Sequence, residues 1–209
     1  MIKAFLFVFE PVKTWDKVAR TTHSVGGLVT RNLLPMLLIT AVVEGYGLVN
    51  WGKHPAMSYQ GLRKFPVGQV AVYEALLLVL LSGVLLVVAQ VLRALGETFH
   101  SRHTFAQALT VVVHGLSPLF VLRLLDAFPL VNPWVSWSIG ILLSMAILYQ
   151  GLPRIMMPDP PHALGLYLTS CLVVLLATGL VRFLTAWYLA GRFPAVESWI
   201  SGLAARLPF

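Results

Sequence analysis

Five long runs of apolar residues constrain the fold of this chain more than any other feature. They occupy residues 33–51, 70–92, 105–125, 134–150 and 164–189, with short connections between them. An α-helix of roughly 20 residues crosses the hydrocarbon core of a membrane, which is about 30 Å thick. The strands of a membrane β-barrel would instead alternate apolar and polar residues over about ten positions. The runs therefore predict an all-α, polytopic membrane helix bundle with about five transmembrane helices.

The composition excludes a water-soluble fold. Of the 209 residues, 58% are hydrophobic and only 11% are charged, whereas about 25% of residues in soluble domains are charged. A soluble domain of this length could not hide so many apolar residues beneath a polar surface. The connections are too short to hold a second domain, so residues 1–209 are predicted to form a single membrane domain.

Both ends of the chain show amphipathic patterns. Apolar residues recur at helical spacing at positions 12, 15, 18 and 19, and again at 196, 199, 200, 203 and 207. Such helices can lie in the headgroup plane of a membrane. They can equally pack on the spans of their own chain, and the sequence leaves both possibilities open. We predict interfacial helices over about 11–27 and 194–207.

The positive charges indicate a membrane topology and argue against nucleic-acid binding. The net charge is +7, but Lys and Arg stand singly at the ends of the apolar runs and form no basic face. Eight of them fall on the side of the N-terminal segment and five on the other side. Because positive residues are retained in the cytoplasm, this count predicts a cytoplasmic N-terminus and a C-terminus across the membrane. The one cysteine, Cys171, allows no internal disulfide.

Several short segments carry a resemblance to a known family. They read EPVKTW at 10–15, LLP at 33–35, FAQAL at 105–109, GLSPL at 115–119 and LYQGLP at 148–153. With five spans in about 200 residues, the chain resembles the bacterial branch of the Yip family (Ypt/Rab-interacting membrane proteins). The resemblance implies a multi-pass protein of the bacterial inner (cytoplasmic) membrane with a cytoplasmic N-terminus and, given five crossings, a periplasmic C-terminus.

The resemblance supplies a fold and leaves the function open. The eukaryotic branch of the family acts in vesicle trafficking through small GTPases. This chain lacks the Asp-Leu-Tyr-Gly-Pro motif of that branch and its long polar N-terminal region. A small GTPase is therefore not an expected partner.

Ionisable residues inside the apolar runs are the candidate site residues. A charged side chain at lipid depth costs about 2.5–3.5 kcal/mol, so Glu44 needs a partner or an ion pathway. Counted along helices that run in the same direction, Glu44 and His114 lie at similar depth, and we predict that they form a buried polar pair. Glu74 lies near the outer end of its run and is predicted to form an ion pair with Arg123 or Arg182.

The sequence contains no recognisable catalytic or cofactor motif. His103, Gln107 and His114 share one helix face and His100 is nearby, but the spacing is not that of a zinc site. No GxSxG, Walker or GxGxxG pattern occurs. We therefore expect no enzyme activity, no metal and no cofactor. Pro35 and Pro118 are expected to kink their helices, and such breaks either line a cavity or only shape the bundle.

These observations favour a non-enzymatic scaffold or accessory subunit that binds other integral membrane proteins or lipids. The alternative is a small transporter or channel that uses Glu44 as its ion-coupling group, and an enzyme acting on lipids comes third. Small and bulky residues on the last run provide the candidate partner face. This face consists of Ala177, Gly179, Leu180, Phe183, Ala186 and Trp187.

Overall fold

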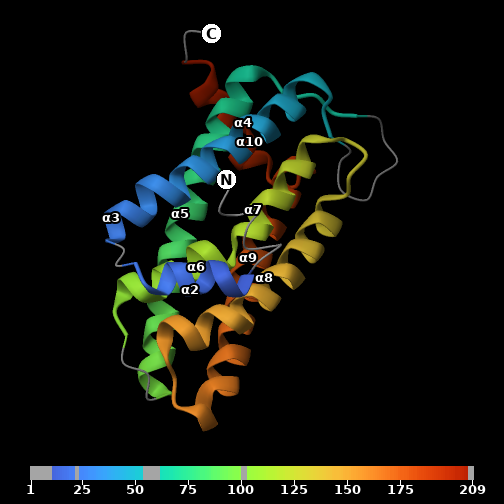
Figure 1. Ribbon diagram of the computed structural model, residues 1–209. Coiled ribbons are helices and arrows are strands. Elements are labelled where there is room, and N and C mark those ends of the chain that lie inside the picture. Colours follow the sequence, from blue (N-terminus) through green and yellow to red (C-terminus); the bar gives the residue numbers. More distant parts are fainter. Residues whose placement is uncertain (1–10, 22–23, 54–61, 100–102, 207–209) are drawn as a thin grey trace.

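The computed structural model describes the chain except residues 1–10, 22–23, 54–61, 100–102 and 207–209, and it is a helix bundle (Figure 1). Five helical segments are long and apolar enough to cross a membrane, which confirms the predicted fold class: Val25–Asn50, Val67–Thr98, Phe105–Ala127, Pro133–Met156 and Pro160–Leu189. Each coincides with one of the five apolar runs, and the first run extends one residue beyond its helix, to Trp51. The protein is therefore a multi-pass membrane protein.

Nine α-helices occur in the described part of the chain. They are α2 (Pro11–Ala19), α3 (Val25–Leu28), α4 (Leu34–Asn50), α5 (Val67–Thr98), α6 (Phe105–Gly115), α7 (Ser117–Arg123), α8 (Pro133–Met156), α9 (Ala163–Leu189) and α10 (Pro194–Ala204). A π-helical turn, η1 (Val29–Leu33), joins α3 to α4, and two 3-10 helices, η2 (Leu124–Ala127) and η3 (Pro160–His162), extend the third span and open the fifth.

The first span begins earlier than its apolar run. Ser24 caps α3 by accepting a hydrogen bond from the backbone N–H of Gly27, and the helix continues through η1 into α4. Pro35 has no N–H to donate to the carbonyl four residues earlier, so one helical hydrogen bond is missing there. The π-helical turn lies directly before this position. The amphipathic segment predicted over 11–27 is consequently shorter: α2 ends at Ala19, and Val25 already belongs to the first span.

The third span is broken where the sequence predicts a kink. Thr104 and Gln107 form a capping box that starts α6, which ends at Gly115 just before Leu116 and Pro118. In Figure 1, α6 runs across the bundle, and the chain then turns so that α7 runs along it. As a result α6 packs on α5 and α8, whereas α7 packs chiefly on α8 and also touches α4.

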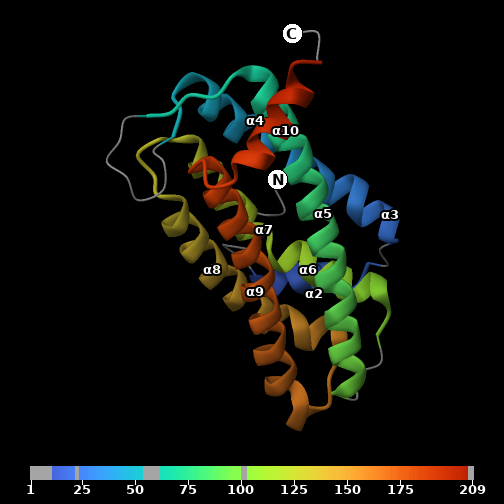
Figure 2. The ribbon, with the colours of Figure 1, turned by 180° about the vertical axis from the view of Figure 1, so that it is seen from behind.

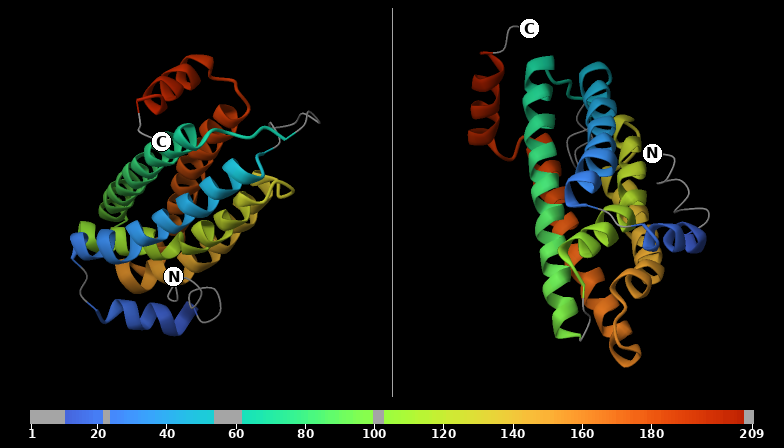
Figure 3. Two further views of the ribbon diagram at one scale, coloured as in Figure 1. Left: turned by 90° about the horizontal axis from the view of Figure 1, so that it is seen from above. Right: turned by 60° about the vertical axis from the view of Figure 1, so that its left-hand side comes forward.

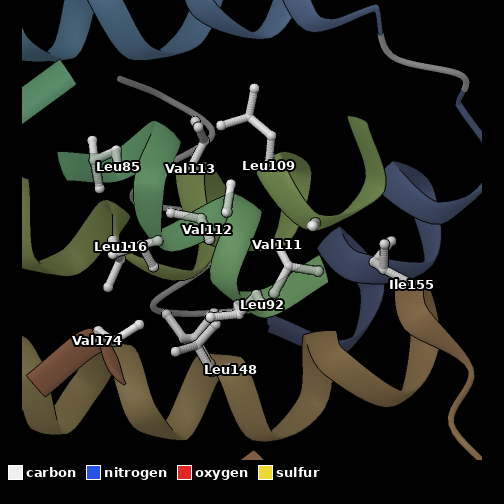
Figure 4. Packing of buried hydrophobic residues seen from close by; sticks show 14 of the residues in the cluster. Leu85, Leu92, Leu109, Val111, Val112, Val113, Leu116, Leu148, Ile155 and Val174 are labelled. Carbon is white, nitrogen blue, oxygen red and sulfur yellow. The ribbon is translucent and has the colours of Figure 1, made fainter. Parts of the chain in front are cut away.

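The main hydrophobic core surrounds α6. Every residue of α6 from Ala108 to Gly115 is buried. Figure 4 shows side chains of α6 between Leu85 and Leu92 of α5 and Leu148 of α8. Helices α5 and α9 lie side by side behind this core (Figure 2). A smaller cluster at the end near α10 contains Tyr73 and Tyr188, whose rings stack 5.0 Å apart.

The two end helices lie on opposite sides of the bundle (Figure 3). Helix α2 packs on α8 of its own chain through Trp15, which is fully buried. Helix α10 packs on α5 through Ile200 and is joined to the connection before α5 by the Arg63–Glu197 ion pair, while Trp199 stays exposed. Packing within the chain thus accounts for Trp15 and Val18 of the apolar face of α2, whereas Val12 and Ala19 of that face are exposed. In α10 it accounts for Ile200, and the helix, predicted over 194–207, ends at Ala204.

Candidate functional site

Charged side chains gather inside the bundle at the end near α10. Glu44 comes from α4, Lys53 from the connection after it, Arg123 from α7, Asp126 from η2 and Arg182 from α9. All five are buried or nearly so. We call these five residues the charge network. Buried charges need partners, so the contacts within the network decide what the site can do.

The first contact is an ion pair between Glu44 and Arg123. Both Nε and Nη2 of Arg123 donate to Oε2 of Glu44, over 2.9 and 2.7 Å. The two side chains are only 2% and 13% exposed. Charge-assisted hydrogen bonds of this kind are about twice as strong as neutral ones. The pair offsets the cost of a carboxylate at lipid depth and holds the first span to the third.

The second contact joins Asp126 to Arg182. Nη2 of Arg182 donates to Oδ2 of Asp126 over 2.6 Å, and the Ser136 hydroxyl donates to Oδ1 over 2.5 Å. Arg182 also donates to the carbonyl of Pro133. Through these bonds the last span is tied to η2 and to the start of α8.

Lys53 completes the charge network from the connection after α4. Its ammonium donates to the backbone carbonyl of Asp126 over 2.5 Å and is buried. Burial lowers the pKa of Lys53 below its ordinary value, and the carboxylates of Asp126 and Glu44 offset only part of this effect. Through its hydrogen bond to Asp126, Lys53 ties the connection after α4 to η2.

The predicted Glu44–His114 pair does not form. The hydrogen bonds of Glu44 go to Arg123. Nδ1 of His114 instead lies 3.0 Å from the carbonyl of Thr110, and its ring meets Trp15 edge-on. The expected depth of His114 assumed that its helix runs along the bundle from Phe105, whereas α6 runs across it (Figure 1). The expectation that the first and third spans are neighbours is confirmed, since α4 contacts α7 and η2.

The predicted ion pairs of Glu74 are also wrong. Arg123 and Arg182 do form ion pairs, but with Glu44 and Asp126. Both carboxylate oxygens of Glu74 are buried without a hydrogen-bond partner in the described part of the chain. Glu74 lies beside Gly45 of α4, close to the Glu44–Arg123 pair, and Arg123 interacts electrostatically with it.

A family comparison bears on the whole of this region. The family model described as the Yip1 domain matches residues 5–183. The chain belongs to the Yip1 family. Comparison with curated proteins and with solved structures finds no match. The Yip family prediction is thus confirmed. The matched region contains the whole charge network of this Yip1-family protein, whereas α10 lies outside it.

The structure divides the predicted partner face of this Yip1-family protein. Leu180, Phe183 and Trp187 are exposed on α9. Gly179 instead faces α8, where an added Cβ would touch the ring of Trp137 at 3.4 Å, and Ala177 packs against the core. Gly179 and Ala177 therefore serve contacts within the chain, whereas Ala186 is half-buried. A substitution at Gly179 would disturb the contact with Trp137 first.

The histidines do not gather into a metal site in the described residues, where no group of three possible ligands occurs. The ring of His103 occupies the space beside Gly96 of α5, and His100 lies outside the described residues. The ion pairs of the charge network can compensate its buried charges and hold the helices of the Yip1-family protein in place. The five residues of the network include no nucleophile–base pair.

Sequence reasoning missed two members of the charge network. Lys53 counted only as a topology signal, and Asp126 was not considered. The sequence does carry a signal for Asp126: it follows Arg123 by three residues at the end of an apolar run. An acid and a base so placed share one helix face at membrane depth, where each needs a partner.

Proposed function

We propose that this Yip1-family protein is a non-enzymatic membrane scaffold or accessory subunit that binds other integral membrane proteins or lipids. The observation that carries the proposal is that the buried carboxylates of the charge network form ion pairs with arginines of the same chain. Glu44 is held by Arg123, and Asp126 by Arg182, so these groups connect spans of the same chain. A carboxylate that couples ion movement must exchange its partner for the ion, and Glu44 is already bound through two donors.

The exposed aromatic side chains of α9 supply the surface that the scaffold needs. Phe183 and Trp187 are 37% and 43% exposed, and their ring centroids lie 4.4 Å apart. Trp187 also contacts Phe193 in the connection to α10. Large aromatic side chains carry much of the binding energy in protein interfaces. We therefore place the partner face on Leu180, Phe183 and Trp187 and leave Gly179 out of it.

The double variant Phe183→Ala/Trp187→Ala is expected to lose a partner that co-purifies with the wild type in mild detergent. Truncating two central contacts lowers affinity by at least about tenfold. The control is Val135→Ala/Leu142→Ala, which shortens two exposed apolar side chains on α8. Quantitative mass spectrometry of tagged protein from its native membrane measures the partner. Equal recovery with both double variants would contradict this face.

The transporter alternative is tested with the purified protein in liposomes. We expect no proton or alkali-cation flux above that of empty liposomes, because the Glu44 carboxylate is bound by Arg123. Flux that is present in the wild type and lost in Glu44→Gln would overturn the scaffold and support the transporter.

We further propose that the protein lies in a bacterial inner membrane, with a cytoplasmic N-terminus and a periplasmic C-terminus. The count of positive residues and the five spans support this orientation. A reporter fused after Phe209 should be active only in the periplasm, and a reporter inserted after His103 only in the cytoplasm. A C-terminal fusion that is active in the cytoplasm would contradict the odd number of crossings.

A further inference from the structure

A pocket opens inside the bundle between α5, α7, α8 and α9. Its empty space, which includes open space at its mouth, is about 570 Å³. The break after Gly115 accounts for its position. Before the break the third span packs on α5, and after it the chain turns so that α7 packs chiefly on α8. The pocket lies between α5 and α7 where the two helices separate, and side chains such as Val84 of α5 and Leu119 of α7 line it.

The pocket is apolar along its length and charged at one end. Its wall on α5 extends from Leu77 to Leu85, which is about 12 Å of helix. Arg123 and Arg182 line it together with Asp126, at the end of the bundle that carries α10. A lining that is mostly apolar, with a few placed polar groups, is typical of ligand sites.

The two arginines keep donors available to a ligand. Arg123 uses Nε and Nη2 for Glu44, and Arg182 uses Nε and Nη2 for Pro133 and Asp126. In the described part of the chain, Nη1 of each makes no hydrogen bond that the structure records, and Nη1 of neither is fully buried. The carboxylate of Asp126 is already engaged by Arg182 and Ser136. The charged end therefore offers guanidinium donors, which suit an anionic oxygen.

We infer that this pocket binds one acyl chain of an anionic membrane lipid from the leaflet on the α10 side, with the lipid's anionic head group at Arg123 and Arg182. The polarity of the pocket matches that of a lipid in this leaflet, since its charged end lies toward the α10 end of the bundle and its apolar wall on α5 reaches Leu85, near the middle of that span. The inference deepens the proposed function, on whose lipid-binding part it rests, by naming the ligand class and the site.

The test counts lipids that remain bound to the purified protein in detergent, by native mass spectrometry. Protein is taken from bilayers of either phosphatidylglycerol or phosphatidylethanolamine. We expect one retained lipid per chain from phosphatidylglycerol, and about fivefold less retention from phosphatidylethanolamine. Val84→Phe and Leu119→Phe, which add bulk from two facing walls, should each lower retention by about tenfold. Val87→Phe is the matched control, because Val87 lies on the same helix as Val84 and is 62% exposed.

Variants are compared only if they are monodisperse and still unfold cooperatively. The comparison of the two lipids uses the wild type, so it tests the inference even if the variants misfold. Equal retention of the two lipids, or no retained lipid, would overturn the inference. So would a folded Val84→Phe or Leu119→Phe protein that keeps its lipid, or a loss of lipid in Val87→Phe. A membrane-protein partner that still co-purifies with lipid-free protein would leave the scaffold intact while removing this site.

Discussion

Replacing Arg123 with leucine is expected to lower the free energy of unfolding by about 3–5 kcal/mol, because it leaves a buried carboxylate without its cation. The Glu44 side chain is 2% exposed and takes both of its hydrogen bonds from Arg123. Glu74 lies close by without a hydrogen-bond partner in the described chain, so the variant would confine two carboxylates beside each other. Reversible unfolding in mixed micelles, followed by circular dichroism, measures the loss.

Replacing the partner, Glu44→Leu, is expected to lower the free energy of unfolding by less than Arg123→Leu does. In Glu44→Leu the guanidinium of Arg123 remains, and Glu74 is near enough to become its new partner. The double variant Glu44→Leu/Arg123→Leu should recover most of the stability that Arg123→Leu loses, because no charge of the pair is left behind. A double variant as unstable as Arg123→Leu would show that the unpaired Glu44 carboxylate is not the cause of the lost stability.

Arg93→Leu provides the matched control for this series. Arg93 also pairs with a glutamate, Glu97, but the two side chains are 42% and 63% exposed, and Nε of Arg93 lies 3.4 Å from Oε1 of Glu97. Exposed pairs of this kind contribute about 0–1 kcal/mol. The contrast between the two arginines would locate the stabilising effect in the charge network and not in arginine itself.

The sequence determined the class and the spans of this protein because lipid leaves few alternatives. A run of about 20 apolar residues must form a helix in a membrane, where every backbone group needs an internal hydrogen bond. The family was readable from short segments such as the one around Pro118, which the Yip1 domain match confirms. The helix break at Gly115 and Leu116 also followed from a proline that cannot donate an N–H.

The partners of the buried charges could not be read from the sequence in the same way. Depth was estimated by counting residues from the start of each span, which holds only for a helix that runs along the bundle. Because α6 crosses the bundle, His114 lies beside Trp15 and Arg123 is brought to Glu44 by α7. Predicting the kink was thus easier than predicting its consequence, since the direction that a chain takes after a break depends on how it packs.

The same limit applied to the partner face, for a different reason. Small residues on a membrane helix indicate close contact, but the sequence does not say with which helix. Gly179 faces Trp137 of its own α8, so the contact that it permits is internal. Of the six residues predicted for the partner face, Leu180, Phe183 and Trp187 are the exposed ones.

Replacing Trp15 with alanine is expected to release α2 from the bundle, at a cost of about 3–5 kcal/mol in the free energy that docks it. The indole is fully buried, its Nε1–H donates to the carbonyl of Ile147 over 3.1 Å, and it fills the space above Gly151 of α8. A Cβ at Gly151 would overlap the indole ring, so Gly151→Val should release α2 as well. The two variants remove one contact from its two sides, and their costs should therefore not add.

Hydrogen exchange measured on α2 tests this interpretation. Protection of the α2 amides should fall in Trp15→Ala and in Gly151→Val, fall little further in the double variant, and stay unchanged in α5. Val12→Ala is the control, because Val12 lies on the same helix with its side chain exposed. If α2 were held chiefly by the headgroup layer, Trp15→Ala would leave its protection intact and Val12→Ala would reduce it. That result would show that α2 is held in the headgroup plane of the membrane and not by packing on the spans of its own chain.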